Sequence, residues 1–474
     1  MAKKGNLFFL IKSLSKAEKR YFKVFANAGR SDANYIRLFD FIDSQDAADD
    51  TAIRNHFKGE AFIRQLHVAK IYLTDMLMKA LRNYYSDDTV DAMLLDMLKD
   101  IGILFRKELY DLCETRIDKA VALAARYEKN ALHLEALAWK RKLLKARRAN
   151  NNAGSGDILL QEEIVLRKLD EIRASWHDME HIFEKANDSS FPRKLKKNKP
   201  LSLQAASLRH HMLYIYFFMN GRTDRAAEEI TELIDLMERQ AHRIEDDPAS
   251  YVTALSNKIS ILFNGRHWKD IEELVGAMRE VPSRYRLGDN RFTVRLWLRI
   301  FNLELELYRD TRQIGKGLQL TNEVEEFFQA HRHAIPQDYH IMISYQVASM
   351  YFMDGNFSKS LKWVNSIINE NFEETRVDLQ CYARFLNLIL HFELDNILVL
   401  RYAVDSCRRF MKKKRNNSEA AQKLLWLFSR LSLSDPGDYK DIFRKWTEDR
   451  ELLRFGEEFK DYLDVNEWVN GRIR

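Results

Sequence analysis

The chain has 474 residues, of which 46% are hydrophobic and 31% are charged, so it can bury a large core beneath a well-solvated surface. This composition excludes a disordered chain. Its 16 glycines and 6 prolines fall well below average usage, which disfavours turn-rich β-architectures and favours long uninterrupted helices. We therefore predict an all-α fold.

Charge and cysteine content further limit the classes of protein to which the chain could belong. The net charge of +6 is a slight excess of 76 basic over 70 acidic residues, which is weak evidence for nucleic-acid binding. Cys113, Cys381 and Cys407 lie far apart without a CxxC pair, so neither a disulfide framework nor a cysteine zinc site is supported. The apolar run from Leu7 to Ile11 is too short for a signal-peptide core or a membrane span. We expect a cytoplasmic protein without membrane contact.

Residues 1–90 are expected to form an N-terminal helical module. Ser15 and Glu18 have the spacing of a capping box, and three short helices then precede a long one that begins near Glu60. This order suits either a helix-turn-helix module or a helical cap. The long helix is apolar over too much of its circumference for a recognition helix, which makes DNA reading the less favoured alternative.

Residues 91–200 read as divergent helical hairpins with one long helix and a basic loop. The polar stretch from Asn150 to Gly156 predicts a break before the long helix. That helix carries apolar residues every three or four positions, which predicts one buried stripe. The stripe consists of Val165, Leu169, Ile172, Trp176, Met179 and Phe183.

Residues 201–415 carry the clearest pattern, seen best in the stretch ASMYFMDGNFSKSLKWV from Ala348 to Val364. Small residues at Ala348 and Ser360 allow two helices to cross closely, and Tyr351 fills the space between them. Gly355 is placed to reverse the chain, because glycine adopts a positive φ without steric cost. The stretch predicts a helical hairpin.

Related segments repeat this hairpin along the chain. Their aromatic or leucine anchors fall at Phe217, Leu262, Tyr308, Tyr351 and Phe392, at intervals of 45, 46, 43 and 41 residues. Regular spacing on this scale is typical of an α-solenoid. The order small, aromatic, Gly turn, aromatic, small, bulky resembles a tetratricopeptide-like repeat, although the period exceeds the 34 residues of that repeat. The resemblance implies a right-handed α-α superhelix.

The resemblance also implies which residues line a concave groove, namely those that follow each anchor and those six residues before it. A Phe/Met stripe across adjacent repeats would suit an apolar peptide or a partner helix. The same side chains could instead be core between repeats, and the sequence leaves both interpretations standing. The predicted groove residues are His211, Phe218, Met219, Phe263, Asn302, Arg309, Tyr345, Phe352 and Met353.

Residues 416–474 are expected to be capping helices, because an unprotected solenoid end would expose an apolar face to water. We expect Trp426, Trp446 and Trp468 to pack within this cap.

Catalytic and cofactor motifs are scarce. His177 to His181 reads HDMEH, a match to the H-x-x-E-H pattern of zinc peptidases, but its histidines fall outside the buried stripe and no third ligand stands out. No phosphate-binding glycine loop or nucleophile elbow occurs. We expect no enzyme activity, no cofactor and no metal.

The expected function is therefore that of a protein- or peptide-binding scaffold, and self-association through solenoid faces is compatible with the pattern. The alternative is a nucleic-acid-binding regulator that uses the N-terminal module or the basic loop, with the solenoid as sensor. The candidate phosphate-binding residues in that loop are Arg193, Lys194, Lys196, Lys197 and Lys199.

Overall fold

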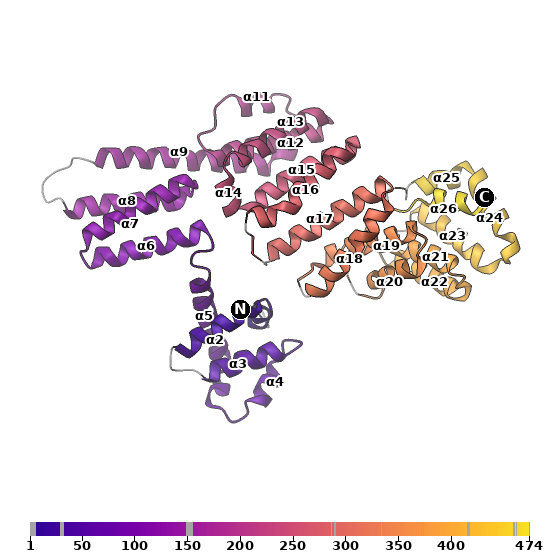
Figure 1. Cartoon of the computed structure of the whole chain (residues 1–474), viewed down its shortest axis with the longest axis horizontal. Coiled ribbons are helices and arrows are strands. Elements are labelled where there is room, and N and C mark those ends of the chain that lie inside the picture. The colour runs from indigo at the N-terminus through magenta and orange to yellow at the C-terminus, as the bar shows by residue number, and fades with distance from the viewer. Residues whose placement is uncertain are drawn as a thin grey trace. The chain divides into compact units, whose positions relative to one another are not determined.

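The computed structural model describes residues 6–28, 33–147, 155–285, 287–288, 291–332, 334–370, 372, 374–414, 418–457, 460 and 462–473. Every regular element within these residues is helical, and no strand occurs among them, so the all-α prediction is confirmed (Figure 1). The chain divides into two compact units, Met1–Arg222 and Thr223–Arg474. This division falls just after Gly221, inside the first predicted repeat hairpin.

The first unit contains the N-terminal module and the divergent hairpins. Its elements are α1 Asn6–Lys12, α2 Lys16–Ala28, α3 Ala33–Ser44, α4 Asp50–His56, η1 Ala61–Gln65, α5 Leu66–Tyr84, α6 Val90–Arg106, α7 Tyr110–Arg126, α8 Asn130–Arg147, α9 Ser155–Glu180, α10 Ile182–Lys185, α11 Phe191–Lys196 and α12 Leu203–Met219.

The second unit contains the repeats and the C-terminal helices. Its elements are α13 Thr223–Glu238, α14 Ala241–Asp246, α15 Pro248–Gly265, α16 Trp268–Arg284, α17 Arg291–Asp310, α18 Ile314–Ala330, α19 Gln337–Met353, α20 Phe357–Ile368, α21 Val377–Glu393, α22 Ile397–Lys413, α23 Glu419–Leu433, η2 Pro436–Asp438, α24 Tyr439–Glu448, α25 Arg450–Glu457 and α26 Val465–Ile473.

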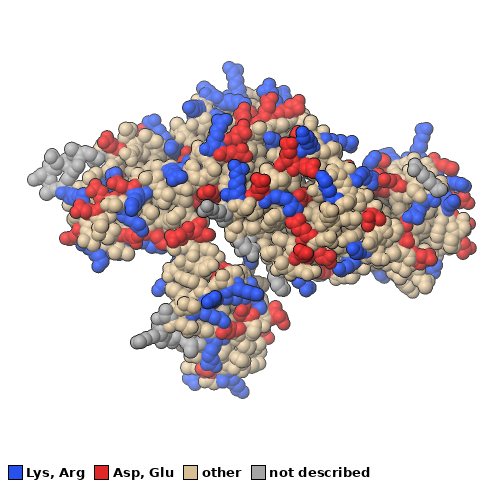
Figure 2. Space-filling view, in the orientation of Figure 1, with Lys and Arg blue, Asp and Glu red and all other residues tan. Residues whose placement is uncertain are grey.

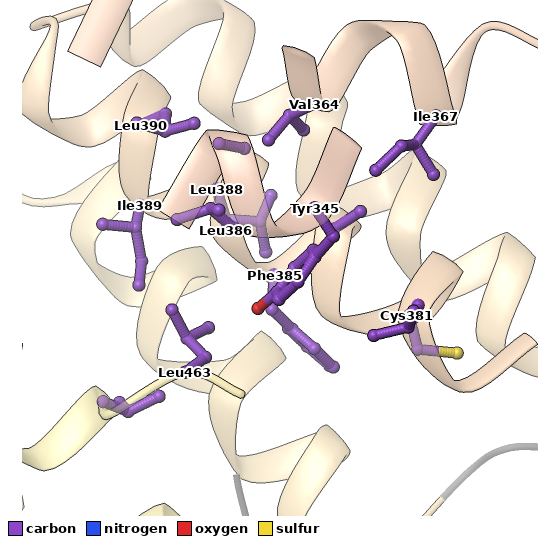
Figure 3. Close-up of a cluster of buried hydrophobic side chains, with 14 of the residues drawn as sticks. Tyr345, Val364, Ile367, Cys381, Phe385, Leu386, Leu388, Ile389, Leu390 and Leu463 are labelled. Atoms are coloured by element: carbon purple, nitrogen blue, oxygen red, sulfur yellow. The ribbon is translucent and has the colours of Figure 1, made fainter. Parts of the chain in front are cut away.

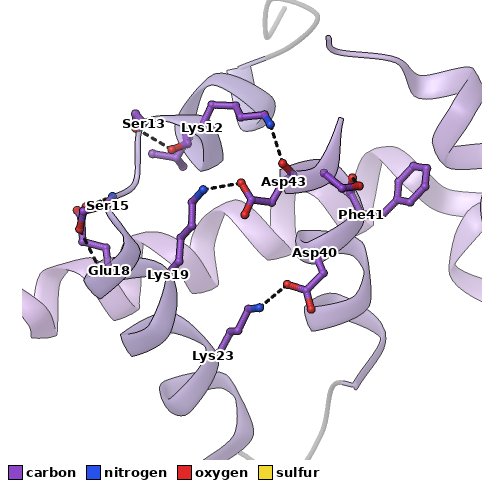
Figure 4. A network of polar contacts seen from close by, with 11 residues as sticks. Lys12, Ser13, Ser15, Glu18, Lys19, Lys23, Asp40, Phe41 and Asp43 are labelled. Atoms are coloured by element: carbon purple, nitrogen blue, oxygen red, sulfur yellow. Dashed lines mark hydrogen bonds and ion pairs between the residues drawn. The ribbon is translucent and has the colours of Figure 1, made fainter. Parts of the chain in front are cut away.

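The capping box that the sequence predicts forms at the start of α2 in the N-terminal module (Figure 4). The Ser15 backbone N–H donates to Glu18 Oε2 at 2.6 Å, and the Glu18 backbone N–H donates to Ser15 Oγ at 3.2 Å. Lys19 on the same helix forms an ion pair with Asp43 on α3 at 2.6 Å. A polar rim of this kind orients α2 and α3 while Phe22 and Phe39 bury their rings beneath it.

The long helix of the first unit departs from its predicted stripe. Val165 and Ile172 are buried as expected, but Trp176 and Phe183 are 50% and 71% exposed, so the prediction of one continuous buried stripe is wrong. The break between α9, which ends at Glu180, and α10, which begins at Ile182, accounts for Phe183, whereas Trp176 lies within α9 and faces solvent. The predicted break at Asn150–Gly156 lies largely outside the described residues, as does the predicted boundary near residue 415.

Consecutive helices pack side by side through the repeats of the second unit (Figure 1). Helix α17 contacts α16 and α18, and also α19, the next helix but one; α19 in turn contacts α20 and α21. One hydrophobic cluster extends from α17 to α26, with Val364, Phe385 and Leu388 among its fully buried members (Figure 3). This pattern is that of a helical array in which neighbours share a continuous core.

The helical hairpins share one type of turn, in which a residue with positive φ follows the first helix and a hydrogen bond spans the turn. In the second unit the backbone N–H of His267 donates to the Leu262 carbonyl, and the same bond joins Gln313 to Tyr308, Asn356 to Tyr351, and Asn396 to His391. A backbone hydrogen bond that spans six residues in this way is characteristic of a Schellman motif. The anchors predicted at Leu262, Tyr308 and Tyr351 are confirmed, whereas the one predicted at Phe392 is off by one residue.

The residue in the left-handed conformation differs from turn to turn. Gly355 adopts a φ of 78°, as predicted, but Arg266, Arg312 and Asp395 adopt φ values of 56°, 56° and 55° at the equivalent positions. A residue with a Cβ is strained there, and glycine is not. The repeats therefore keep the turn geometry with side chains that are not optimal for it.

A small residue is required where helices approach closely. Ser360 is fully buried and its hydroxyl donates to the Ala348 carbonyl at 2.7 Å, which confirms that these two residues mark the crossing of α19 and α20. At the equivalent position of the preceding hairpin, a Cβ on Gly317 would overlap the Met350 side chain. The close crossing fixes the angle between the helices of each pair.

The turns yield a first prediction. Gly355→Ala should lower the free energy of unfolding by about 1 kcal/mol, because nothing but the backbone conformation opposes a Cβ there. Asp395→Gly should raise it by about 0.5–1 kcal/mol by relieving the same strain. Urea denaturation followed by circular dichroism measures both. If the two variants changed the free energy of unfolding by the same amount and in the same direction, that result would contradict a shared turn geometry.

Candidate binding groove

The second unit contains a cavity of about 1060 Å³. Its walls come from α17, α19 and α21, from the connection between α15 and α16, and from the C-terminal segment that includes α26. Pockets that bind small molecules or side chains commonly measure about 300–1,000 Å³, so this cavity is large enough to hold a ligand. It is the candidate functional site.

Helical spacing explains which side chains reach the cavity. Asn302, Glu306 and Arg309 on α17 are separated by four and three residues, so they lie on one face of the helix. Tyr345 and Phe352 line the cavity from α19, seven residues apart on one face. The opposite faces of these helices are apolar and packed into the core, which orients the polar stripe toward the cavity.

The C-terminal segment covers the groove through a main-chain contact. The buried Tyr345 hydroxyl donates to the Tyr462 carbonyl at 2.9 Å, and the Tyr462 ring stacks on Tyr382 with ring centres 4.6 Å apart. Leu463 is buried in the same hydrophobic cluster as Phe385 (Figure 3). Burial raises the pKa of Tyr345, so its phenol remains protonated and keeps its role as donor.

Polar contacts hold α26 beside this segment. Glu393 at the end of α21 accepts a hydrogen bond from Trp468 Nε1 at 2.6 Å and forms an ion pair with Arg472. Arg312, the strained turn residue after α17, forms an ion pair with Glu467. These contacts join the ends of the repeat helices to α26.

Most charges that line the cavity neutralise one another. Arg309 donates to Gln346 Oε1 at 3.0 Å and pairs with Asp310 at 2.9 Å. The Arg376 guanidinium pairs with Asp378 at 2.7 Å, and this pairing lowers the pKa of the Asp378 carboxyl. The wall is therefore polar but has little free charge at these positions.

Two of the described charges that line the cavity are exceptions, the exposed Arg266 in the turn before α16 and Glu306 on α17. The Glu306 carboxylate is half-buried and has no hydrogen bond or ion pair among the described residues. Burial raises its pKa, and Arg309 offsets that effect in part. One turn earlier on α17, the Asn302 amide oxygen is buried without a hydrogen-bond partner. Two unmatched acceptors therefore lie on the same face of one helix.

The structure brings together five of the nine predicted groove residues, since Asn302, Arg309, Tyr345, Phe352 and Met353 all line the cavity. Phe263 does not line it and instead contacts the Trp268 ring, with ring centres 6.0 Å apart. The other three predicted residues belong to α12 in the first unit.

On α12, Phe218 and Met219 are exposed, and Phe218 contacts the Tyr214 ring. His211 is half-buried against the same tyrosine, and burial lowers its pKa. These three side chains belong to the first unit.

Several cavity residues escaped the sequence analysis. Glu306 and Ser349 lie three residues before Arg309 and Phe352, so adding helical spacing to the positions that the resemblance implies would have reached them. Tyr462 and Leu463 carried no comparable signal, because a contact across more than a hundred residues leaves no local pattern.

The predicted basic loop is solvent-facing. Arg193, Lys194, Lys196, Lys197 and Lys199 are all exposed on or just after α11, and Lys194 pairs with Asp188 at 3.0 Å. On the face shown in Figure 2, lysine and arginine side chains are interspersed with aspartate and glutamate.

The HDMEH stretch forms no metal site. His177 and His181 stack on one another with ring centres 4.6 Å apart, and His181 Nδ1 lies 2.8 Å from the His177 carbonyl oxygen. Together with Glu180 they do not form a group that could hold a metal ion. His177 and Glu180 are exposed, as the sequence analysis expects for a solvated helix flank.

No helix among the described residues has the length and apolar character needed to cross a membrane. No protein-family profile matches the chain, and no curated protein matches it either.

The cover over the groove can be tested with Tyr345→Phe, which removes only the hydroxyl that holds the Tyr462 carbonyl. We expect the free energy of unfolding to fall by about 0.5–1.5 kcal/mol, the usual contribution of one hydrogen bond. Hydrogen exchange at Tyr462 and Leu463 should speed up. Tyr339→Phe on the same helix is the matched control, and unchanged exchange in Tyr345→Phe would contradict the contact.

Proposed function

We propose that the protein is a non-enzymatic, cytoplasmic scaffold that binds another protein through the groove of the second unit. In this proposal the repeats are a tetratricopeptide-like, right-handed superhelix, and the partner inserts a short segment or a chain end. One observation carries the proposal: the groove already holds a short non-helical stretch of polypeptide, the chain's own Tyr462 and Leu463, through a hydrogen bond to the Tyr462 carbonyl and a ring stack.

The repeat geometry supports the tetratricopeptide-like assignment. The hairpin turns recur with one hydrogen-bonding pattern, and the inner helices α17, α19 and α21 all contribute to the cavity. Tandem helical hairpins present their inner helices on a concave face, which suits peptide capture. Phe352 is half-buried at this face, so it can contact a ligand and still pack against the core.

A selection from a random peptide library on the full-length chain tests this proposal. We expect enriched peptides whose affinity falls at least tenfold with Phe352→Ala, because the substitution removes apolar surface from the cavity wall. Phe385→Ala is the comparison for a purely structural residue: it is fully buried and should cost about 3–5 kcal/mol of stability. A comparable stability loss in Phe352→Ala, with peptide affinity unchanged, would mark Phe352 as core and contradict the proposal.

A second function, binding of nucleic acid by the first unit, is favoured by one observation, the exposure of five cationic side chains on and just after the short helix α11. Phosphate binding releases counterions, so retention on DNA or RNA should fall steeply between 50 and 200 mM salt, by roughly tenfold for every two phosphates contacted. Charge reversal of Lys196, Lys197 and Lys199 together should abolish retention. Retention that is equal in the variant would exclude this loop as the contact.

A further inference from the structure

The unmatched acceptors on α17 define a more specific site within the groove. We infer that Glu306 and Asn302 form a subsite for a single cationic group on an alkyl stem, the ammonium or guanidinium of a lysine- or arginine-like ligand. The inference deepens the proposed function and rests on the groove being the binding site.

The first argument is the absence of any partner for the Glu306 carboxylate. A carboxylate taken partly out of water loses hydration, and proteins normally compensate with an ion pair or hydrogen bonds. Glu306 has neither among the described residues, although it lines a cavity with room for a ligand. Two other glutamates with buried side chains do have such a partner: Glu304 forms an ion pair with Arg279, and Glu393 forms one with Arg472.

The second argument is that the nearest cation is already engaged. Arg309 lies one turn from Glu306, but its guanidinium donates to Gln346 and to Asp310. The Asp310 carboxylate offsets part of the Arg309 charge, so Arg309 compensates the charge of Glu306 only in part. A bound cation would neutralise it.

The third argument is the buried amide oxygen of Asn302. Residues four apart on a helix lie about 5–6 Å from each other at Cβ, so Asn302 and Glu306 are neighbours on one face of α17. An ammonium or guanidinium group carries several N–H donors and no acceptor, so it suits two neighbouring acceptors.

The same cavity supplies apolar surface for the ligand stem. Tyr345, Phe352 and Met353 line it from α19, and Trp268 lines it from the start of α16. Lysine and arginine bury their methylene stems against surfaces of this kind while the charged end makes polar contacts. Aromatic rings also attract a cation directly.

The test uses the full-length chain with n-butylammonium and n-butylguanidinium as probes, and neutral butyramide as the control ligand, detected by saturation-transfer NMR. We expect both cations to bind saturably, and Glu306→Gln to weaken them at least fivefold. Asn302→Asp should strengthen them, since it adds a second carboxylate. Glu326→Gln on the exposed face of α18 is the matched control and should bind as the wild type does.

The origin of the cation is distinguished by adding a capped pentapeptide with a central lysine or arginine. Tighter binding of the peptide than of the free probe identifies a side chain of a partner protein, and tighter binding of the free probe identifies a small organic cation. Folding is checked by the melting temperature of Glu306→Gln, which should stay equal or rise because the carboxylate has no partner.

Three results would overturn the inference: no saturable binding of either cation, equal binding by wild type and Glu306→Gln, or binding of butyramide as tight as that of the cations. Peptides from the library selection separate this inference from the proposed function. If they bind Glu306→Gln as tightly as wild type but lose affinity with Phe352→Ala, the groove binds peptides and the cation subsite is wrong.

Discussion

The second unit depends on the burial of the central part of helix α19. Residues 343–351 are all buried, because α17 and α18 cover one side of the helix while α20 and α21 cover the other. A helix that is apolar all round has no solvent face, so its position is set by its neighbours rather than by amphipathicity. Its few polar groups then have fixed roles: the Tyr345 hydroxyl holds the C-terminal segment, and Gln346 holds Arg309. Helix α19 thereby supplies one wall of the cavity, beside the walls from α17 and α21.

Much of this architecture could be predicted from the sequence because it repeats. The turn residues and the small residues at helix crossings recur at similar intervals, and each copy strengthens the interpretation of the others. The tetratricopeptide-like resemblance, carried over by position, then implied a common surface for Asn302, Arg309, Tyr345 and Phe352, and they line one cavity. The error at the fifth anchor arose because His391 and Phe392 are adjacent and aromatic. Only the hydrogen bond from Asn396 identifies His391 as the equivalent of Tyr351.

Long-range packing could not be predicted in the same way. Trp426 was expected in the C-terminal cap but is 48% exposed, whereas Trp446 and Trp468 are buried as expected. The difference depends on which face of α23 meets α22 and α24, and the periodicity of a single helix that is rich in apolar residues does not determine it. The same limit applies to Tyr462, whose partners Tyr345 and Tyr382 are distant in sequence.

The C-terminal cover also constrains what the groove can accept. Helix α26 is integral to the core, since Val465 and Val469 are fully buried and the Trp446 indole N–H donates to Asn466 Oδ1 at 2.9 Å in a buried hydrogen bond. Removing it would expose apolar surface and leave a polar group unsatisfied, which makes a detachable strap costly. A long peptide that runs the whole length of the groove would have to displace this cover. A side chain, a chain end or a compact ligand would not, because the cavity that receives it is already present beneath the cover.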